Sequence, residues 1–374
     1  MPDAPPITAV PFIDLARQHA EQQEALEAAL LSTFRKGAYC NGPAVQAFER
    51  ECEAWLGQPV AAIACSNGTD ALVLAIRGLG LAPGQQVLTP GFSFFASGSA
   101  ICLAGGTPVF ADVDPATYCV SRATLEAAWK PGIAGILVVH LYGHPAPMEE
   151  IMAFAKEKGI WVLEDCAQAF GARINGQTVG TFGDAAGVSF YPTKNLNAAG
   201  DAGLILAKDP AVAERIRLLR VHGERPRYTH SILGGNHRMD DLQAAILSVK
   251  LPRLDHWNAE RRLIASEYEA AWRDLPLRLP PLGGNGVEPI FHQFTIACDR
   301  RDAVKDHLTS LGVGCGVYYP VPLHAQPLFG GMPSPDPCPV STRLSTEVLS
   351  LPIFPQLHKE ERIAVISAVR SFFL

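Results

Sequence analysis

The sequence predicts an α/β protein whose central sheet is mostly parallel and is flanked by helices. The first observation is a repeated alternation of short apolar runs with helical stretches, which is typical of strand–helix–strand crossover units. The second is the composition, with 48% hydrophobic and 18% charged residues, which fits a globular chain and neither a disordered nor a coiled-coil one. The third is the length of 374 residues, which corresponds to two domains at a typical domain size of about 150.

The large domain is predicted to span residues 1–252. It begins with a helix from about Asp14 to Lys36, where apolar residues recur near helical spacing, and a second helix begins near Pro43. The predicted strands that follow lie at 61–65, 85–90, 108–113, 135–141 and 160–165, with helices at 68–80, 95–105 and 147–159 between them. The runs 185–192 and 202–207 have no helix between them, so we expect a hairpin at or near one edge of the sheet.

A smaller α+β domain is predicted for residues 253–374. A long helical stretch from 240 to 275 contains Pro252, which should kink or split it near the domain boundary. A Pro- and Gly-rich segment, a strand within 291–299 and a helix near 302–311 follow.

Composition and charge exclude several classes of function. The net charge is −6 and there is no long basic block, so nucleic acid is not an expected partner. The longest apolar run, 133–139, is too short to cross a membrane, and the first residues do not look like a secretion signal. Nine scattered cysteines without a CxxC pair argue against a disulfide framework and a zinc site. We therefore expect a soluble protein of the reducing cytoplasm that holds no metal.

Three features are candidates for chemistry. Asp165 closes a predicted parallel strand, at the sheet edge where α/β proteins bind ligands, although an Asp there equally often caps a helix. Lys194 lies between an apolar strand and a glycine-bearing turn; burial there would lower its amine pKa as Schiff-base chemistry requires, and the alternative is a solvated surface charge. The turn 66–71 offers a helix N-terminus and the Thr69 hydroxyl to a phosphate, although such turns are also common without a ligand.

In this order, these features resemble the sugar-nucleotide aminotransferases of the DegT/StrS type, within the fold-type I pyridoxal phosphate (PLP) enzymes. The resemblance spans nearly the whole chain, in the segments FIDLARQ, CSNGTDAL, TPGFSFFAS, GHPAPMEEI, LEDCAQAFGA, FGDAAGVSFYPTKNL, GGNHRMDDLQAAIL, YYPVPLHAQ and LSLPIFP. It implies the fold-type I transferase fold. Within the family, residues 221–251 look most like enzymes that aminate 3-keto-6-deoxyhexoses on a nucleoside diphosphate.

The resemblance implies two catalytic residues. Lys194 would form the Schiff base with PLP and later move a proton between substrate and cofactor. Asp165 would pair with the pyridine nitrogen and keep it protonated, which makes the ring an electron sink. Gln168 would lie near the ring hydroxyl. Phe94 would lie against the ring face, with ordinary core packing beside Phe92 and Phe95 as the alternative.

The resemblance also implies phosphate and substrate ligands. Gly68, Thr69 and Ser189 would hold the cofactor phosphate, and Asn236 would reach the phosphate in a neighbouring subunit, which implies a homodimer with composite active sites. The candidates for the sugar nucleotide are the loop residues Arg225, Arg227, Tyr228 and His230, and Tyr319 and His324 of the small domain. Arg, Tyr and His donors suit a diphosphate, and a solvated loop is the alternative for 223–230.

The implied function is a PLP-dependent aminotransferase. It would take an amino group from L-glutamate, hold it as pyridoxamine phosphate (PMP), and transfer it to a keto-sugar nucleotide, a dTDP-3-keto-6-deoxyhexose, for glycan or secondary-metabolite biosynthesis. The alternatives are amination at carbon 4 of a UDP-, GDP- or dTDP-4-keto sugar, and a non-catalytic PLP-binding regulatory homologue. The related sugar 3-dehydratases have histidine in place of the Schiff-base lysine, and Lys194 opposes that hypothesis.

Two other signals are set aside. His140 and His144 have the spacing of a helical metal pair, but an apolar strand precedes them and Gly143 lies between them, which opposes a helix. The glycines in 78–84 close a helix and do not open one after a strand, so they do not match a dinucleotide-binding fingerprint.

Overall fold

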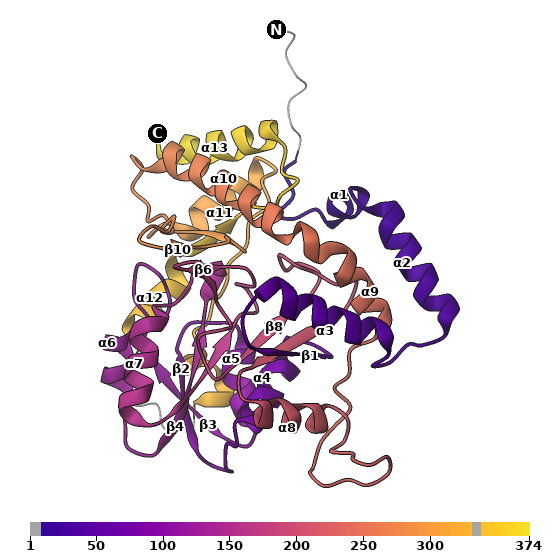
Figure 1. Cartoon of the computed structure of the whole chain (residues 1–374). Helices are drawn as coiled ribbons and strands as arrows, with labels where there is room; N and C mark the ends of the chain where they lie inside the picture. Colours follow the sequence, from indigo (N-terminus) through magenta and orange to yellow (C-terminus); the bar gives the residue numbers. More distant parts are fainter. Residues whose placement is uncertain (1–8, 331–337) are drawn as a thin grey trace.

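The computed structural model describes residues 9–330 and 338–374 and is organised around a seven-stranded sheet (Figure 1). Its strand order is β1-β9-β8-β5-β4-β2-β3. The bounds are β1 Ala61–Cys65, β2 Gln86–Pro90, β3 Thr107–Ala111, β4 Ile133–Val139, β5 Trp161–Asp165, β8 Ala185–Ser189 and β9 Gly203–Ala207. All neighbours pair in parallel except β9, which is antiparallel to both β1 and β8. The predicted mostly parallel sheet is confirmed, and the predicted hairpin is β8–β9, with β1 beyond it at the edge.

Helices pack on this sheet in the order that the crossover pattern predicts. The bounds are α3 Pro43–Leu56, α4 Gly68–Gly78, α5 Phe95–Leu103, α6 Arg122–Ala128, α7 Met148–Lys158 and α8 Pro210–Arg220. Helix α4 packs against β8 and β9, and its residues from Ala71 to Ile76 are all buried. Helices α6 and α7 pack against β3 and β5 respectively. The sheet strands are buried on both sides, as expected when helices cover a parallel sheet.

The N-terminal helix differs from its prediction. It is divided into α1 Leu15–Ala20 and α2 Gln23–Lys36, because Gln22 between them has a non-helical backbone (φ −132°, ψ 18°). Asp14 caps the start of α1 by accepting from the Arg17 N–H, and Gly37 ends α2 in the left-handed conformation. In Figure 1, α2 lies beside α9 (Asp241–Lys250), with which it is in contact.

The long C-terminal helical stretch is interrupted where the proline predicts. Helix α9 is followed by a single 3₁₀ turn, Leu251–Arg253, and then by α10, Leu254–Trp272. Pro252 lies at the start of that turn, where it needs no backbone N–H. The predicted interruption is therefore confirmed.

A second hydrophobic cluster lies at the C-terminal end of the chain, in the upper part of Figure 1. Its elements are α10, β11 Phe294–Ala297, α11 Arg301–Ser310, β12 Val348–Leu351 and α13 Lys359–Phe373. The rings of Tyr268 and Trp272 stack at 4.6 Å, and Phe294 packs edge-on against both. A helix, α12 Pro339–Glu347, precedes β12, and three short strands form a further sheet, β6 Arg173–Ile174, β7 Gln177–Thr178 and β10 Val287–Glu288. The boundary at 252/253 remains a prediction.

Across the described ranges, 9–330 and 338–374, we find no helix with the length and apolar character of a membrane span.

Candidate active site

A cavity of about 840 Å³ lies where the carboxyl ends of β5 and β8 meet the N-terminus of α4. This is the edge at which α/β sheets bind ligands. Eight of the predicted site residues line it: Gly68, Thr69, Phe94, Asp165, Gln168, Ser189, Lys194 and Tyr319. Segments far apart in the sequence are thus brought to one place by the parallel register of the strands.

Asp165 is the last residue of β5 and is only 5% exposed. Its Oδ1 accepts from the Ala167 N–H at 3.1 Å, and its Oδ2 accepts from the Ser97 hydroxyl at 2.9 Å. Burial raises the pKa of the Asp165 carboxyl, and these two donors together with the nearby Lys194 charge oppose that rise. Asp165 is therefore a carboxylate held by fixed donors at the cavity wall.

Lys194 lies on the loop that follows β8. Loss of water around its amine lowers the pKa of Lys194 to about 8, and the Asp165 carboxylate opposes this decrease. A lysine with such a pKa has a substantial neutral fraction near physiological pH, and the neutral amine is the nucleophile in Schiff-base formation.

The loop that carries Lys194 is supported from behind by buried polar side chains. Asn195 donates to Asn258 Oδ1 at 2.8 Å, and Asn197 donates to the Pro192 carbonyl at 2.7 Å. The buried amine of Lys250 donates to Asn197 at both its carbonyl (3.0 Å) and its Oδ1 (2.6 Å). The loop position is therefore fixed by contacts outside the cavity.

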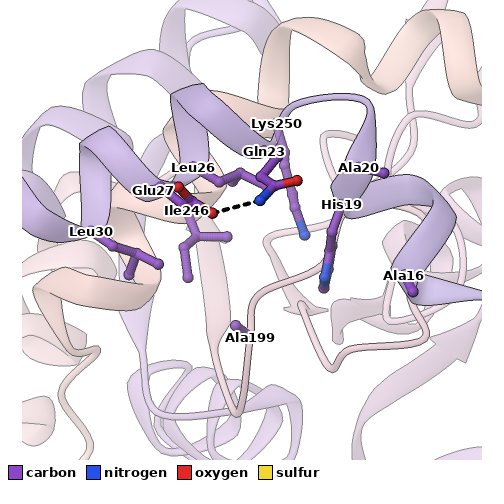
Figure 2. Close-up of a pocket in the computed structure, with 10 residues that line it drawn as sticks. All are labelled: Ala16, His19, Ala20, Gln23, Leu26, Glu27, Leu30, Ala199, Ile246 and Lys250. Carbon is purple, nitrogen blue, oxygen red and sulfur yellow. Dashed lines mark hydrogen bonds between the residues drawn. The ribbon is translucent and has the colours of Figure 1, made fainter.

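Lys250 also borders a second cavity of about 360 Å³, between α1, α2 and α9 (Figure 2). Figure 2 shows Gln23 bonded to Glu27 along one side, and His19 and Ala199 pointing toward the same space. The catalytic candidates Lys194 and Asp165 do not line it. The larger cavity is therefore the candidate active site.

An anion cradle forms one end of the larger cavity. Asn67 caps α4 by accepting the Asp70 N–H at 2.9 Å, which leaves the N–H groups of Gly68 and Thr69 at the helix N-terminus. A Cβ on Gly68 would lie 2.6 Å from the Ser189 Cβ, so only glycine permits this close approach. The helix start and the Ser189 side chain are thereby held together.

Three side chains shape the opposite part of the cavity. Gln168 accepts from the Tyr142 N–H at 2.6 Å and donates to the Tyr319 hydroxyl at 3.1 Å, which fixes the orientation of its amide. Phe94 is 53% exposed and its ring lies 5.8 Å from that of Tyr319. An exposed aromatic ring at a cavity wall is available to a flat ligand, whereas Phe92 beside it is fully buried as core.

The residue before Asp165 belongs to a separate buried cluster, His140, Glu164 and Cys166. Both oxygens of Glu164 are engaged: Oε1 accepts from Phe182 and Gly183 at 2.8 and 2.7 Å, and Oε2 accepts from Gly180 and His140 at 2.8 and 3.0 Å. The other His140 nitrogen accepts from the Ala146 N–H at 3.0 Å. This hydrogen bonding accounts for the polar atoms of His140 and Glu164 and fixes loop 180–183 to β5.

The other predicted residues lie away from this cavity. Arg225, Arg227, Tyr228 and His230 are exposed on a loop after α8, where Arg225 pairs with Glu214 and Arg227 lies over the Tyr228 ring. Asn236 is exposed, and its backbone pairs with Val221. His324 contacts the Thr342 hydroxyl at 3.2 Å and does not reach the cavity.

Three residues near this site were missed by the sequence analysis. Ser97 bonds Asp165 directly, and its only sequence signal is a serine pair four residues apart at the start of an apolar helix. His292 and Arg261 both line the cavity. Arg261 lies on the apolar stripe of α10 and donates to the carbonyls of residues 291, 292 and 353, at 3.1, 3.3 and 2.7 Å. Burial lowers the pKa of Arg261 to about 9 and that of His292 well below its usual value.

The sequence comparison matches one protein family over almost the entire chain. The model of the DegT/DnrJ/EryC1/StrS aminotransferase family matches residues 19–370. The chain belongs to this family. The chain is 42% identical to a UDP-N-acetyl-3-dehydro-α-D-glucosamine 3-aminotransferase of Acidithiobacillus ferrooxidans, covering 97% of both chains. It is 41% identical to a protein of Geobacillus stearothermophilus named pleiotropic regulatory protein, covering 97% of this chain and 98% of the relative.

Solved structures of the family share the fold. DesV of Streptomyces venezuelae, solved in complex with a ketimine intermediate, has a TM-score of 0.94 and 38% identity, covering 98% of this chain and 99% of DesV. NtdA of Bacillus subtilis, solved with bound cofactor PMP, has a TM-score of 0.90 and 30% identity, covering 98% and 86%. The fold-type I fold is thereby confirmed.

Members of this family are PLP-dependent enzymes, and the cavity suits the cofactor in each of its parts. The anion cradle at α4 matches a phosphate, the fixed carboxylate of Asp165 matches a basic ring nitrogen, and the amine of Lys194 matches an aldehyde. The prediction of an aminotransferase that uses PLP is confirmed at the level of the family.

Proposed function

We propose that this enzyme transfers an amino group from L-glutamate to a keto-sugar nucleotide, a dTDP-3-keto-6-deoxyhexose, in the cytoplasm. The observation that carries the proposal is the convergence of Lys194, Asp165 and the α4 anion cradle in one cavity. Relatives with 3-amino sugar names support position 3: the A. ferrooxidans protein and, at 38% identity over 97% of this chain, a dTDP-3-amino-3,4,6-trideoxy-α-D-glucose transaminase of S. venezuelae. One name specifies UDP and the other dTDP; we propose dTDP because the dTDP name is the one that describes a 6-deoxy sugar, the sugar class of the enzymes that residues 221–251 resemble.

Asp165 and Lys194 divide the work at the reacting end. PLP, when bound, supplies a ring that takes up negative charge from the substrate carbon. The Asp165 carboxylate holds the ring nitrogen in its protonated form, because a buried negative charge favours a proton beside it. The Lys194 amine binds the cofactor and then carries the proton between two carbons, for which its pKa of about 8 is suitable.

The remaining cavity residues orient the cofactor. Gly68, Thr69 and Ser189 hold the phosphate with backbone and hydroxyl donors at the positive end of α4. Phe94 would cover one ring face, and the Gln168 amide, which is fixed between Tyr142 and Tyr319, would contact the ring hydroxyl. Orientation by fixed side chains lowers the entropy that the reaction must lose.

A second copy of the chain would complete the site. Asn236 and the loop 223–230 are exposed and lie outside the cavity of their own chain, yet they contain Arg, Tyr, His and Asn donors that suit phosphate groups. We propose that they reach the cavity of the partner in a homodimer, with Asn236 at the cofactor phosphate and Arg225, Arg227, Tyr228 and His230 at the sugar-nucleotide diphosphate. Tyr319 would contact the substrate from the same chain; His324 would need a shift of its segment to do so.

The decisive experiment supplies purified enzyme and PLP with L-glutamate and a panel of keto-sugar nucleotides. We expect amino-sugar product, identified by mass spectrometry and NMR, from the dTDP-3-keto-6-deoxyhexose, and none with Lys194→Ala. Product only from a 4-keto sugar would move the reaction to carbon 4, and product only from a UDP sugar would change the base.

A regulatory role is the second candidate, because the G. stearothermophilus relative is named as a regulatory protein. PLP binding without turnover across the whole panel would favour it and contradict the proposed activity. For the compartment, the eight cysteines other than Cys338 form no disulfide in the described part of the chain, which suits a reducing cytoplasm.

A further inference from the structure

Ser97 occupies a position that links two parts of the proposed cofactor site. It lies in the first turn of α5, whose N-cap is Phe94, the ring-facing aromatic. Ser97 is fully buried and Ser93, one turn earlier, is 3% exposed. A buried serine hydroxyl needs a partner, and here the partner is the catalytic carboxylate.

The direction of the hydrogen bonds follows from proton counting. The Ser97 Oγ lies 2.9 Å from Asp165 Oδ2 and 2.9 Å from the Ser93 Oγ. An ionised carboxylate only accepts, so the single Ser97 proton is directed to Asp165, and the Ser93 hydroxyl must donate to Ser97. The Ala167 N–H occupies the other carboxylate oxygen at 3.1 Å. Each oxygen therefore has one fixed donor, which sets the plane of the carboxylate.

We propose that Ser97 is a positioning residue that keeps the Asp165 carboxylate charged and aimed at the cofactor ring nitrogen, with Ser93 orienting its hydroxyl. This inference rests on the proposed role of Asp165. Hydrogen bonds to charged groups contribute more free energy than bonds between neutral groups, and they are stronger where water is excluded. The same short helix start then sets both the ring face, through Phe94, and the ring nitrogen, through Ser97.

Few groups other than Ser97 stabilise the charged form of the Asp165 carboxyl. Burial raises the pKa of its carboxyl, and the groups that oppose this are the Ala167 N–H, the Ser97 hydroxyl, the Lys194 amine and the His140 side chain. The thiol of Cys166 and the hydroxyl of Tyr319 also interact electrostatically with it, but burial raises the pKa of both. Ser97 is the one neutral side-chain donor among them, so its removal should favour the protonated acid.

The test measures PLP affinity of the apoprotein as a function of pH for wild type, Ser97→Ala, Ser97→Thr, Ser93→Ala and Ser99→Ala. Ser99 is on the same helix and is partly exposed, so Ser99→Ala is the matched control.

We expect Ser97→Ala to weaken PLP binding roughly tenfold or more, as for loss of a hydrogen bond to a charged group. We also expect the acid limb of binding to move to higher pH, because protonated Asp165 is the form that binds poorly. Ser97→Thr should restore most of the affinity, and Ser93→Ala should lose less than Ser97→Ala.

A double-mutant cycle with Asp165→Asn separates this role from a structural one. If Ser97 acts through the carboxylate, Ser97→Ala should change affinity less than twofold in the Asp165→Asn background. Equal losses in both backgrounds, or an unchanged affinity and pH profile in Ser97→Ala, would overturn the inference. If Asp165→Asn itself bound PLP like wild type, the proposed role of Asp165 would fail, which is a different result.

Discussion

The inner wall of the cavity and the segment from 221 to 237 contribute very differently to the proposed site. On the inner wall, Asp165 and Gln168 are 5% and 8% exposed and each has fixed hydrogen-bond partners. In the outer segment, Tyr228 and Leu233 are 77% and 83% exposed. One chain therefore positions the side chains of the proposed reacting end by itself, whereas the exposed donors of the outer segment would need a second surface over them to form a binding site.

The largest expected effect is on the inner wall, at Lys194. Lys194→Ala should reduce turnover by roughly 10²–10⁴-fold or more, because it removes the group that binds the cofactor and moves the proton. The apoprotein should unfold at the same temperature or higher. The folded-state pKa of Lys194 is about 8, below its ordinary value of 10.5. The free-energy cost of burying the charged amine is therefore fully present below pH 8 and is relieved as pH rises toward 10.5. Steady-state kinetics and calorimetry measure the two quantities, and a marked loss of apoprotein stability would contradict this view of the wall.

Rigidity of the inner wall should depend on Glu164. Glu164→Ala leaves three backbone donors and His140 without their acceptor, which should cost about 3–5 kcal/mol of unfolding free energy, since each buried donor left unpaired costs about 1–3 kcal/mol. Denaturant unfolding measures this loss. Glu150→Ala, at an exposed acid on α7, is the control, and we expect little change there. Similar stabilities for the two variants would show that the wall does not depend on this cluster.

The outer segment should affect substrate binding more than folding. Arg227→Ala should raise the KM for the sugar nucleotide roughly 10- to 100-fold, as expected for lost hydrogen bonds to a charged group. It should leave the half-reaction with glutamate and the unfolding temperature almost unchanged, since the Arg227 side chain is exposed and lies over the Tyr228 ring of its own chain. Half-reaction kinetics separate the effects, and an equal loss in both halves would place Arg227 outside the sugar-nucleotide site.

The smallest effect is a shift in pH dependence. The rate at which apoprotein takes up PLP should rise roughly tenfold per pH unit in acid and level off near pH 8, as the neutral fraction of Lys194 saturates. Since the Asp165 carboxylate raises the pKa of Lys194, Asp165→Asn should move the plateau to lower pH. Stopped-flow absorbance measures this rate, and a rise that continues to pH 10 would mean that the amine is not desolvated.

The inner wall was largely predictable from sequence, and the reason is topological. Strands that run in the same direction end at one edge, so Asp165 and Ser189 at the ends of β5 and β8, and Gly68 at the start of the helix after β1, necessarily converge. The Pro252 interruption was predictable because proline lacks an N–H.

The supporting contacts were not predictable. Ser97 and Arg261 belong to apolar helix faces, and nothing local marks which distant group they bond. The same holds for the break at Gln22, where no glycine or proline interrupts the helical pattern. The proposed positions of Asn236 at the cofactor phosphate and of loop 223–230 at the substrate would depend on a second chain, which no local pattern describes.

Mixing two inactive variants tests most directly whether one chain supplies the inner wall and its partner the outer donors. Lys194→Ala and Asn236→Ala would be co-expressed with different tags, and the mixed species isolated through both tags. In a composite site, one cavity of the mixed dimer has both Lys194 from its own chain and Asn236 from the other, so the account predicts that amination returns to about half the wild-type rate per dimer. If Asn236 acted within its own chain, each cavity of the mixed dimer would lack either Lys194 or Asn236. A mixed dimer as inactive as its parents would therefore contradict a composite site.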